Sequence, residues 1–210
     1  SIYNPQEMEF EFRSGPIMGN IILADEINRT SPKTQAALLE GMEESTITID
    51  GKTMHLPQPF FVMATQNPIE YEGTYPLPEA QLDRFLFKLK MGYPSMLEEI
   101  EVLSRAEKEV QFSHLETVLT LEDLRKLQSV VKEVTVDDSI KSYIVSCVTE
   151  TRTNSYVNLG VSPRGSLALM KSCQAYAMLK GRMYVTPDDV QYLAPFVFSH
   201  RIILRPEARY

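Results

Sequence analysis

The sequence has few cysteines, no long apolar run and no excess of positive charge. Its two cysteines, Cys147 and Cys173, lie far apart in apolar, helix-like stretches. This placement favours two buried, reduced thiols in a cytoplasmic protein over a disulfide. No apolar run approaches the length of a membrane-spanning helix, so we expect no membrane span. The three histidines show no ligand-like spacing, and we therefore expect no structural metal site.

The charge balance is acidic, with 21 Lys and Arg residues against 28 Asp and Glu residues and a net charge of −7. A protein that coats a nucleic-acid backbone needs a basic footprint, so this balance disfavours a nucleic-acid partner. The net charge does not describe how charges are distributed, so it does not exclude a local basic stripe. The hydrophobic content of 43% and the charged content of 23% are typical of a globular protein. A length of 210 residues fits one large domain or two small ones.

The first part of the chain, residues 1–93, reads as alternating strands and helices. "NIILA" at 20–24 and "FFVMAT" at 60–65 are continuous apolar runs. Such runs are typical of strands inside a parallel sheet that helices cover on both faces. Residues 8–12 alternate between apolar and polar side chains, which predicts a further strand.

A helix and a hairpin are predicted between the two apolar strands. "PKTQAALLEGME" at 32–43 predicts the helix, with Thr30 or Ser31 as its N-cap. "STITIDGKTMHLP" then alternates on both sides of Asp50 and Gly51. Because Asp-Gly between two alternating runs is a strong hairpin signal, we expect a β-hairpin inserted before the second apolar strand.

The second part, residues 94–210, is predicted to be helical, with Gly92 and Pro94 marking the boundary. The predicted helices lie near residues 95–109, 120–132, 136–152, 163–180 and 187–197. Thr120 and Thr186 each precede an aspartate by three residues, as in a capping box. The end of the chain forms either a final strand or an extended segment. The sequence thus predicts an incomplete α/β domain followed by an all-helical domain.

Two adjacent carboxylates, Asp25 and Glu26, end the first apolar strand in "IILADEINRT". Ligands bind beyond the carboxyl ends of strands in open α/β sheets. An Asp there can hold a hydrated magnesium ion, and the adjacent Glu can orient or deprotonate an attacking water. The metal charge would also relieve the repulsion between the two side chains. The dipeptide alone favours the simpler alternative, a strand that ends in acidic residues where it reaches solvent.

An amide, Asn67, follows the second apolar strand in "FFVMATQNP". An amide at this edge can hydrogen-bond both a phosphate oxygen and a water, which suits a detector of a terminal phosphate. Asn-Pro after a strand is, taken alone, an ordinary turn. Two neighbouring strands that deliver carboxylates and an amide to the same edge favour a site.

Two arginines complete the set of candidate residues. Arg84 lies in "LPEAQLDRFLF", where Pro78 opens a short helix. Arg164 lies in "GVSPRG", in the first turn of a helix that Ser162 can cap. A cation in that turn opposes the helix dipole unless it faces an anion that the helix N-terminus also attracts. For either arginine alone, a surface salt bridge is the commoner explanation.

Three stretches together resemble the MoxR family of AAA+ ATPases: "GPIMGNIILADEINRTSPKTQAALLEGMEE", "FFVMATQNPIEYEGTYPLPEAQLDRF" and "GVSPRG". The similarity runs from about Phe10 to His200, in the order and spacing of the family. The resemblance implies an α/β, incomplete AAA+ P-loop NTPase core with an inserted β-hairpin, followed by an all-helical lid domain. In this family the hairpin projects toward the pore or the partner, and residues 8–12 would end an insert in the second helix.

The resemblance also implies roles for the candidate residues, with ATP and Mg²⁺ as cofactors. Asp25 and Glu26 match the Walker B pair, with Asp25 for magnesium and Glu26 for the water. Asn67 matches the first sensor. Arg84 matches the arginine finger that reaches a nucleotide on the neighbouring subunit, which implies a ring, usually a hexamer. Arg164 matches the second sensor, and the sequence leaves open whether it acts in its own subunit or in the next.

One motif of the family is missing: no G-x-x-x-x-G-K-[ST] occurs in the sequence. The family carries this phosphate-binding loop upstream of the position where Ser1 stands. We therefore expect these residues to be a truncated part, or the ordered part, of a longer ATPase, and we expect them alone to bind ATP poorly and to hydrolyse essentially none. A degenerate, inactive homologue is less favoured, because all the other catalytic positions are filled.

The family analogy implies that the full-length protein is a chaperone-like ring. Such rings remodel or mature partner proteins, often by inserting a metal or cofactor, and commonly act with a von Willebrand factor A domain partner. One alternative is a motor for nucleic acid or for chelation, like the helicase and magnesium-chelatase relatives. The acidic balance and a hairpin with only Lys52 as a fixed positive charge disfavour a DNA-tracking loop. The other alternative is a nucleotide-free interaction module.

Overall fold

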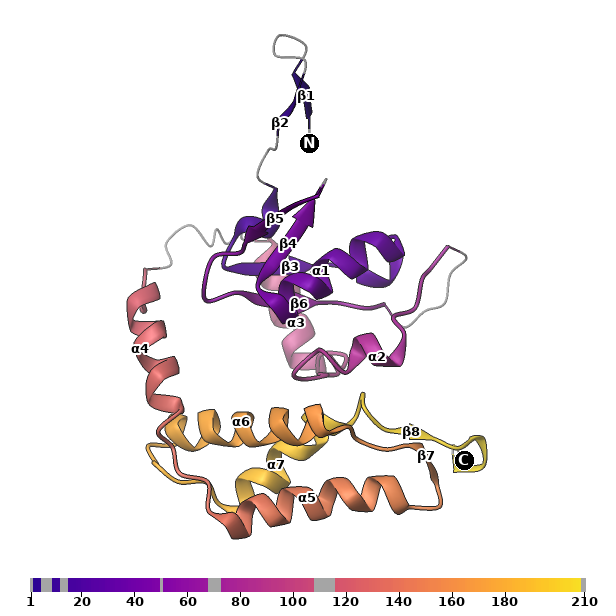
Figure 1. The fold of residues 1–210 in the computed structure, drawn as a ribbon, viewed down its shortest axis with the longest axis vertical. Coiled ribbons are helices and arrows are strands. Elements are labelled where there is room, and N and C mark those ends of the chain that lie inside the picture. The colour runs from indigo at the N-terminus through magenta and orange to yellow at the C-terminus, as the bar shows by residue number, and fades with distance from the viewer. Residues whose placement is uncertain are drawn as a thin grey trace. The chain divides into compact units, whose positions relative to one another are not determined.

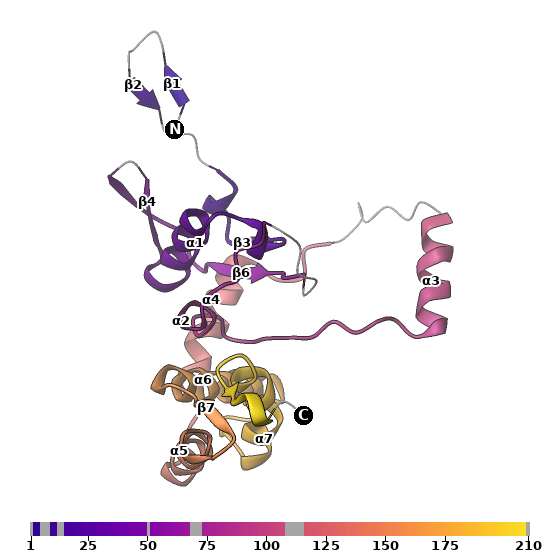
Figure 2. The same ribbon diagram turned by 90° about the vertical axis from the view of Figure 1, so that its right-hand side faces the viewer.

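A computed structural model describes residues 2–4, 9–11, 15–49, 51–67, 73–107 and 116–208 of the chain. These residues form two compact units, Ser1–Phe85 and Leu86–Tyr210 (Figures 1 and 2). The boundary that the sequence predicts after residue 93 lies inside the second unit. The parallel strands and the hairpin belong to the first unit, and the long helices after residue 95 belong to the second.

The first unit is built on a parallel pair of strands, β3 (Ile21–Ala24) and β6 (Phe61–Ala64). Their register pairs Ile21 with Phe61 and Ala24 with Ala64. Both predicted strands and their parallel arrangement are therefore confirmed. Since parallel strands start and end together when paired in this register, the residues that follow Ala24 and Ala64 leave the sheet side by side.

The two faces of this strand pair have different environments. The inward side chains of β3 and β6 pack on a core cluster formed by Ile27, Leu38, Leu39 and Leu77. The other face, called here the open sheet face, consists of four side chains that are exposed by 66%, 63%, 55% and 47%: Ile21, Leu23, Phe61 and Met63. The expected burial of both faces is met on one face only within the described part of the chain.

Helix α1 (Pro32–Glu44) covers the buried face of the strands. It begins at Ser31, whose hydroxyl accepts a hydrogen bond of 3.3 Å from the Thr34 amide, and Pro32 occupies the first turn. Ser31, one of the two residues predicted, is thus the N-cap. The spacing of Gln35, Leu38 and Leu39 places these buried side chains on one face of the helix.

The predicted hairpin is formed by β4 (Thr46–Ile49) and β5 (Lys52–His55), which pair antiparallel. Ile49 faces Lys52 across the turn, so the loop has the two-residue length that the Asp-Gly pattern predicts. Gly51 has a φ of 75°, a conformation that glycine adopts without strain. Asp50 lies outside the described residues. Figure 1 shows the hairpin next to α1, where the Thr48 hydroxyl donates a 2.8 Å hydrogen bond to Oε1 of Glu40.

Shorter elements complete the first unit. Strands β1 (Ile2–Asn4) and β2 (Glu9–Glu11) pair antiparallel, and β2 falls within the strand predicted at residues 8–12. Residues 8 and 12 themselves lie outside the described ranges, and β1 had no signal in the sequence. Two 3₁₀ helices, η1 (Pro16–Met18) and η2 (Ile27–Arg29), precede and follow β3. The short helix α2 (Glu79–Leu82) begins after Pro78, as predicted.

The second unit is mainly helical. Its helices are α3 (Met96–Glu107), α4 (Leu121–Val131), α5 (Asp138–Thr153), α6 (Pro163–Leu179) and α7 (Pro187–Phe198), which confirms the five predicted helices. Figure 1 shows α5, α6 and α7 packed together, and their apolar faces form a core around the fully buried Leu169 and Val197. Two short strands, β7 (Val157–Leu159) and β8 (Ile203–Leu204), pair antiparallel. The end of the chain is therefore a strand followed by η3 (Pro206–Ala208), the first of the two predicted alternatives.

Candidate functional site

The candidate site lies where β3 and β6 end. Asp25 follows β3 and Thr65 follows β6, so the strand register places them next to each other. The parallel ladder continues past the strands, because the Thr65 amide donates to the Ala24 carbonyl at 3.0 Å and the Ile27 amide donates to the Thr65 carbonyl at 3.0 Å. This edge is therefore held by backbone hydrogen bonds before any side chain is considered.

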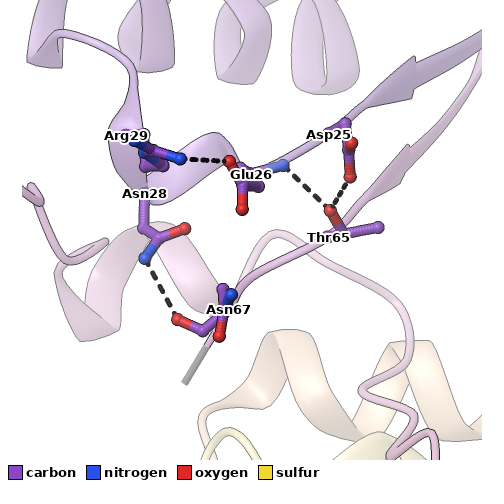
Figure 3. Close-up of polar contacts among 6 residues, drawn as sticks. All are labelled: Asp25, Glu26, Asn28, Arg29, Thr65 and Asn67. Carbon is purple, nitrogen blue, oxygen red and sulfur yellow. Dashed lines mark hydrogen bonds and ion pairs between the residues drawn. The ribbon is translucent and has the colours of Figure 1, made fainter. Parts of the chain in front are cut away.

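The Thr65 hydroxyl connects the two carboxylate residues at this edge. It donates a short hydrogen bond to Oδ1 of Asp25 and accepts one of 2.9 Å from the Glu26 amide (Figure 3). A threonine hydroxyl has one donor and two acceptor positions, so it can make both bonds at once. Thr65 was not among the residues that the sequence indicated.

Glu26 has a left-handed backbone, with φ 47° and ψ 50°. This conformation costs a residue other than glycine about 1–2 kcal/mol, and it turns the chain sharply from β3 into η2. The Glu26 carboxylate then meets Arg29 one turn later, with 2.8 Å between Oε2 and Nη1 (Figure 3). The two adjacent carboxylates therefore have different partners, a hydroxyl for Asp25 and a cation for Glu26. These partners reduce the repulsion that the sequence suggested.

Asn67 follows β6 at the same edge and is exposed. Its backbone carbonyl accepts a 3.3 Å hydrogen bond from Nδ2 of Asn28 (Figure 3). The structure thus brings Asp25, Glu26 and Asn67 together, as the sequence predicted. Oδ1 of Asn28 is buried and accepts no hydrogen bond from the described residues, which leaves an acceptor for a water or a ligand donor at this loop.

A buried glutamine supports the loop behind the site. Gln35 of α1 is only 2% exposed, and its Nε2 lies 3.2 Å from the Ile27 carbonyl and 2.9 Å from the Tyr75 carbonyl. The Tyr75 amide in turn donates to the Asn28 carbonyl at 2.6 Å. These bonds fasten η2 to α1 and to the segment before α2. Sequence reasoning missed Gln35, although a polar residue in the apolar stripe with Leu38 and Leu39 was a usable signal.

Arg84 belongs to the same unit but contacts α1. Its Nε lies 2.6 Å from Oε2 of Glu43, and its Nη1 donates to the Ala80 carbonyl at 2.9 Å. The two charged side chains are 31% and 34% exposed. They line a cavity of about 230 Å³ between α1 and α2, together with Ala36, Leu39, Glu40 and Gln81. Arg84 is therefore partly presented to solvent beside α1.

Arg164 belongs to the second unit, in the first turn of α6, and is exposed. The residues on either side of Arg164 in the chain are closely packed. A Cβ on Gly165 would lie 2.3 Å from Cγ1 of Val161, which is itself fully buried. The Val161 carbonyl accepts a 2.8 Å hydrogen bond from Nε of Arg152, and its amide donates to the Thr151 hydroxyl at 3.0 Å. Ser162 is the N-cap residue but its side chain makes no capping bond.

The strand edge suits a hard divalent cation bound with outside ligands. Among the described residues, no three side chains of His, Cys, Asp or Glu are grouped to hold a metal on their own. Mg²⁺ is usually bound by one or two carboxylates together with waters and phosphates, so a single exposed Asp25 fits it. Thr65 contacts Oδ1 of Asp25, and no bond to Oδ2 is found in the described chain.

No helix in the described ranges is long and apolar enough to cross a membrane.

Known families and proteins match both units. Residues 1–87 match a family described as "ATPase family associated with various cellular activities (AAA)", and residues 149–210 match "AAA lid domain". Uncharacterized protein YeaC of Bacillus subtilis is 67% identical over 210 residues, which are 100% of this chain and 66% of that protein. Chaperone MoxR1 of Mycobacterium tuberculosis is 44% identical, over 99% of this chain and 57% of that protein.

A solved structure matches as well. The crystal structure of a candidate ATPase from Cytophaga hutchinsonii has a TM-score of 0.89 and 39% identity, and the match covers 99% of this chain and 66% of that chain. The predicted AAA+ fold, a parallel sheet with helices followed by a helical lid, is thereby confirmed. The chain spans 66% of the length of YeaC and 57% of MoxR1. On the sequence identity and the two matching families, the chain belongs to the MoxR family of AAA+ ATPases.

Proposed function

We propose that the full-length protein hydrolyses ATP with Mg²⁺, and that the edge formed by β3 and β6 faces the terminal phosphate. One observation carries this proposal: two carboxylates and an amide, Asp25, Glu26 and Asn67, meet at the carboxyl end of two parallel strands in register (Figure 3). Open α/β sheets bind ligands at this end. The family, AAA+ ATPases, supports the same reaction.

Each residue at the edge has a distinct role in this proposal. Asp25 holds Mg²⁺ through water, and the bound ion would neutralise the charge that develops on the phosphates. Glu26 orients or deprotonates the attacking water. Its ion pair with Arg29 joins side chains that are 38% and 65% exposed, and exposed pairs contribute only about 0–1 kcal/mol. The Glu26 carboxylate can therefore leave Arg29 at little cost. Asn67 contacts the terminal phosphate and the water.

The two arginines act from outside this edge in the proposal. Arg84 is the arginine finger that reaches a nucleotide on the neighbouring subunit of a ring, which we propose to be a hexamer. Its position beside α1, 31% exposed, is compatible with such a reach. Arg164 contacts the nucleotide as the second sensor, where the N-terminus of α6 also favours an anion.

The proposed cellular role is chaperone-like. The ring would remodel or mature partner proteins, by inserting a metal or cofactor, together with a von Willebrand factor A domain partner. Support comes from the family and from the relative named Chaperone MoxR1. A DNA-acting role gains no support from the hairpin, where Lys52 is the only lysine or arginine in β4 and β5. No P-loop motif occurs in the 210 residues, so we expect these residues alone to hydrolyse essentially no ATP.

The test uses the full-length protein and measures magnesium-dependent ATP turnover for the wild type, Asp25→Asn and Glu26→Gln. Removing a general base lowers a rate by about 10²–10⁴-fold, so Glu26→Gln should lower kcat by that factor and keep nucleotide affinity. Asp25→Asn should lose the dependence of nucleotide binding on magnesium. Glu44→Gln, a change of an exposed carboxylate at the end of α1, is the matched control and should turn over ATP normally. Wild-type turnover in Glu26→Gln would show that the assignment is wrong.

A further inference from the structure

We propose that Thr65 is a positioning residue of the hydrolytic site, and that its hydroxyl sets the geometry of Asp25 and Glu26 together. The inference rests on the proposed function, since it assigns Thr65 a task at that same edge. The observation behind it is a single hydroxyl that bonds to both residues, one through the carboxylate and the other through the backbone amide (Figure 3).

The hydroxyl is held in place by its own backbone. Thr65 is fixed to the Ala24 carbonyl through its amide and to the Ile27 amide through its carbonyl, each at 3.0 Å. Two backbone bonds and two side-chain bonds thus join this one residue to the segment 24–27. These bonds hold the Thr65 hydroxyl in one position at the end of β6. Supporting residues that are held in this way keep reactive groups in their productive geometry.

The contact with Asp25 fixes the orientation of its carboxylate. The Thr65 hydroxyl holds Oδ1, and no bond to Oδ2 is found in the described chain, so Oδ2 is the oxygen left to face a hydrated ion. An exposed aspartate without such a partner samples several rotamers. Residues that orient a metal-binding side chain affect metal affinity or activity by about 10–100-fold when they are removed. Thr65 therefore acts on magnesium through Asp25.

The contact with Glu26 supports an unfavourable turn. Glu26 has φ 47°, and its amide donates to the Thr65 hydroxyl at 2.9 Å. A left-handed residue other than glycine persists only where its surroundings hold it. Without the hydroxyl, the Glu26 amide loses this acceptor and the turn can relax, which moves the Glu26 carboxylate relative to the phosphate edge. A displacement of about 1 Å is enough to cost a reaction on the order of 10²-fold.

A purely structural role for Thr65 makes a different prediction. Strand ends often use a hydroxyl to satisfy a backbone amide, and the loss of such a bond lowers stability without changing the response to magnesium. Catalysis and magnesium dependence therefore distinguish the two roles, and stability alone does not.

The test compares Thr65→Val, which keeps the shape and loses the hydroxyl, with Thr65→Ser, which keeps the hydroxyl, in the full-length protein. We expect Thr65→Val to lower kcat at saturating ATP by about 10–100-fold and to raise the magnesium concentration for half-maximal turnover. Thr65→Ser should restore most of both. Thr65→Ala also lacks the hydroxyl and is measured beside Thr65→Val, in case one of the two does not fold. Melting curves show which variants are folded, and a folded variant without the hydroxyl tests the inference.

A second measurement asks whether Thr65 acts through Asp25. Binding of a fluorescent ATP analogue with and without Mg²⁺ is compared in Thr65→Val, Asp25→Asn and the double variant. If Thr65 acts through Asp25, Thr65→Val should change the magnesium dependence of nucleotide binding in the wild-type background. In the Asp25→Asn background it should cause no further change in that dependence. Normal kcat and magnesium dependence in a folded Thr65→Val would overturn the inference, as would a Thr65→Ser variant as defective as Thr65→Val. Full turnover in Asp25→Asn and Glu26→Gln would instead overturn the proposed function.

Discussion

Replacing Arg84 by alanine in the full-length protein should abolish most ATP turnover while changing stability little. In the structure, the guanidinium makes one ion pair with Glu43 at 2.6 Å and one hydrogen bond to the Ala80 carbonyl at 2.9 Å. Both charged side chains are about one-third exposed, at 31% and 34%. Ion pairs with this much solvent contact contribute about 0–1 kcal/mol, and a hydrogen bond adds about 1 kcal/mol.

These contacts set the expected loss of stability at about 1–2 kcal/mol. For a protein of about 150–250 residues, a loss of 1 kcal/mol in the free energy of unfolding lowers Tm by about 2–4 °C. The Tm of Arg84→Ala should therefore fall by only a few degrees, as measured by calorimetry. Loss of an arginine finger lowers kcat by about 10³–10⁵-fold. The effect on turnover should thus be far larger than any effect of partial unfolding at the assay temperature.

Glu43→Gln provides the matched control, because it removes the ion pair and keeps the guanidinium. We expect it to lower Tm by less than Arg84→Ala does, because the hydrogen bond from Arg84 to the Ala80 carbonyl remains, and to retain most turnover. Mixed rings test whether the arginine acts on the next subunit. Neither Arg84→Ala nor Glu26→Gln subunits should turn over ATP alone, and mixing them should recover part of the activity. Normal turnover in Arg84→Ala, or no recovery in mixed rings, would refute the role of Arg84 as a finger in trans.

Two further predictions concern the second unit. Gly165→Ala should lower the free energy of unfolding by about 1–3 kcal/mol, because the added Cβ would lie 2.3 Å from Cγ1 of Val161. Urea unfolding measures this loss. Gly92→Ala is the neutral control, because a Cβ on Gly92 meets no atom within 4 Å. Burial, with a smaller contribution from the Asp189 charge, raises the pKa of the Cys173 thiol to about 12, from 9.0. The thiol therefore stays protonated in the folded state and ionises in the unfolded state above pH 9, so its contribution to stability is complete below pH 9 and falls as the pH rises toward 12. Between pH 8 and pH 10 the loss should be about 1 kcal/mol, measured by urea unfolding and absent in Cys173→Ala; an equal loss in that variant would contradict it.

Local patterns in the sequence predicted most of the elements. The apolar runs at β3 and β6, the hairpin and the capping boxes at Thr120 and Thr186 each depend on a few consecutive residues, and the structure has all of them. The meeting of Asp25, Glu26 and Asn67 was predictable too, because parallel strands bring their carboxyl ends to one edge.

Most of the missed features depend on residues far apart in the chain. Thr65 joins Asp25 only through the register between two strands that lie about forty residues apart. The pairs Arg84–Glu43 and β7–β8 likewise connect distant segments through packing that no local pattern shows. The left-handed backbone of Glu26 is a local feature, but nothing marks it in the sequence, since glutamate has no preference for that conformation.

The open sheet face has a practical consequence for handling these 210 residues. Its four side chains, Ile21, Leu23, Phe61 and Met63, form one contiguous apolar surface on strands that, in the described chain, pair only with each other. Apolar patches and unpaired strand edges are where other chains attach and where aggregation begins. The polypeptide produced by itself therefore has a built-in tendency to self-associate, and the yield of folded material will fall as its concentration rises.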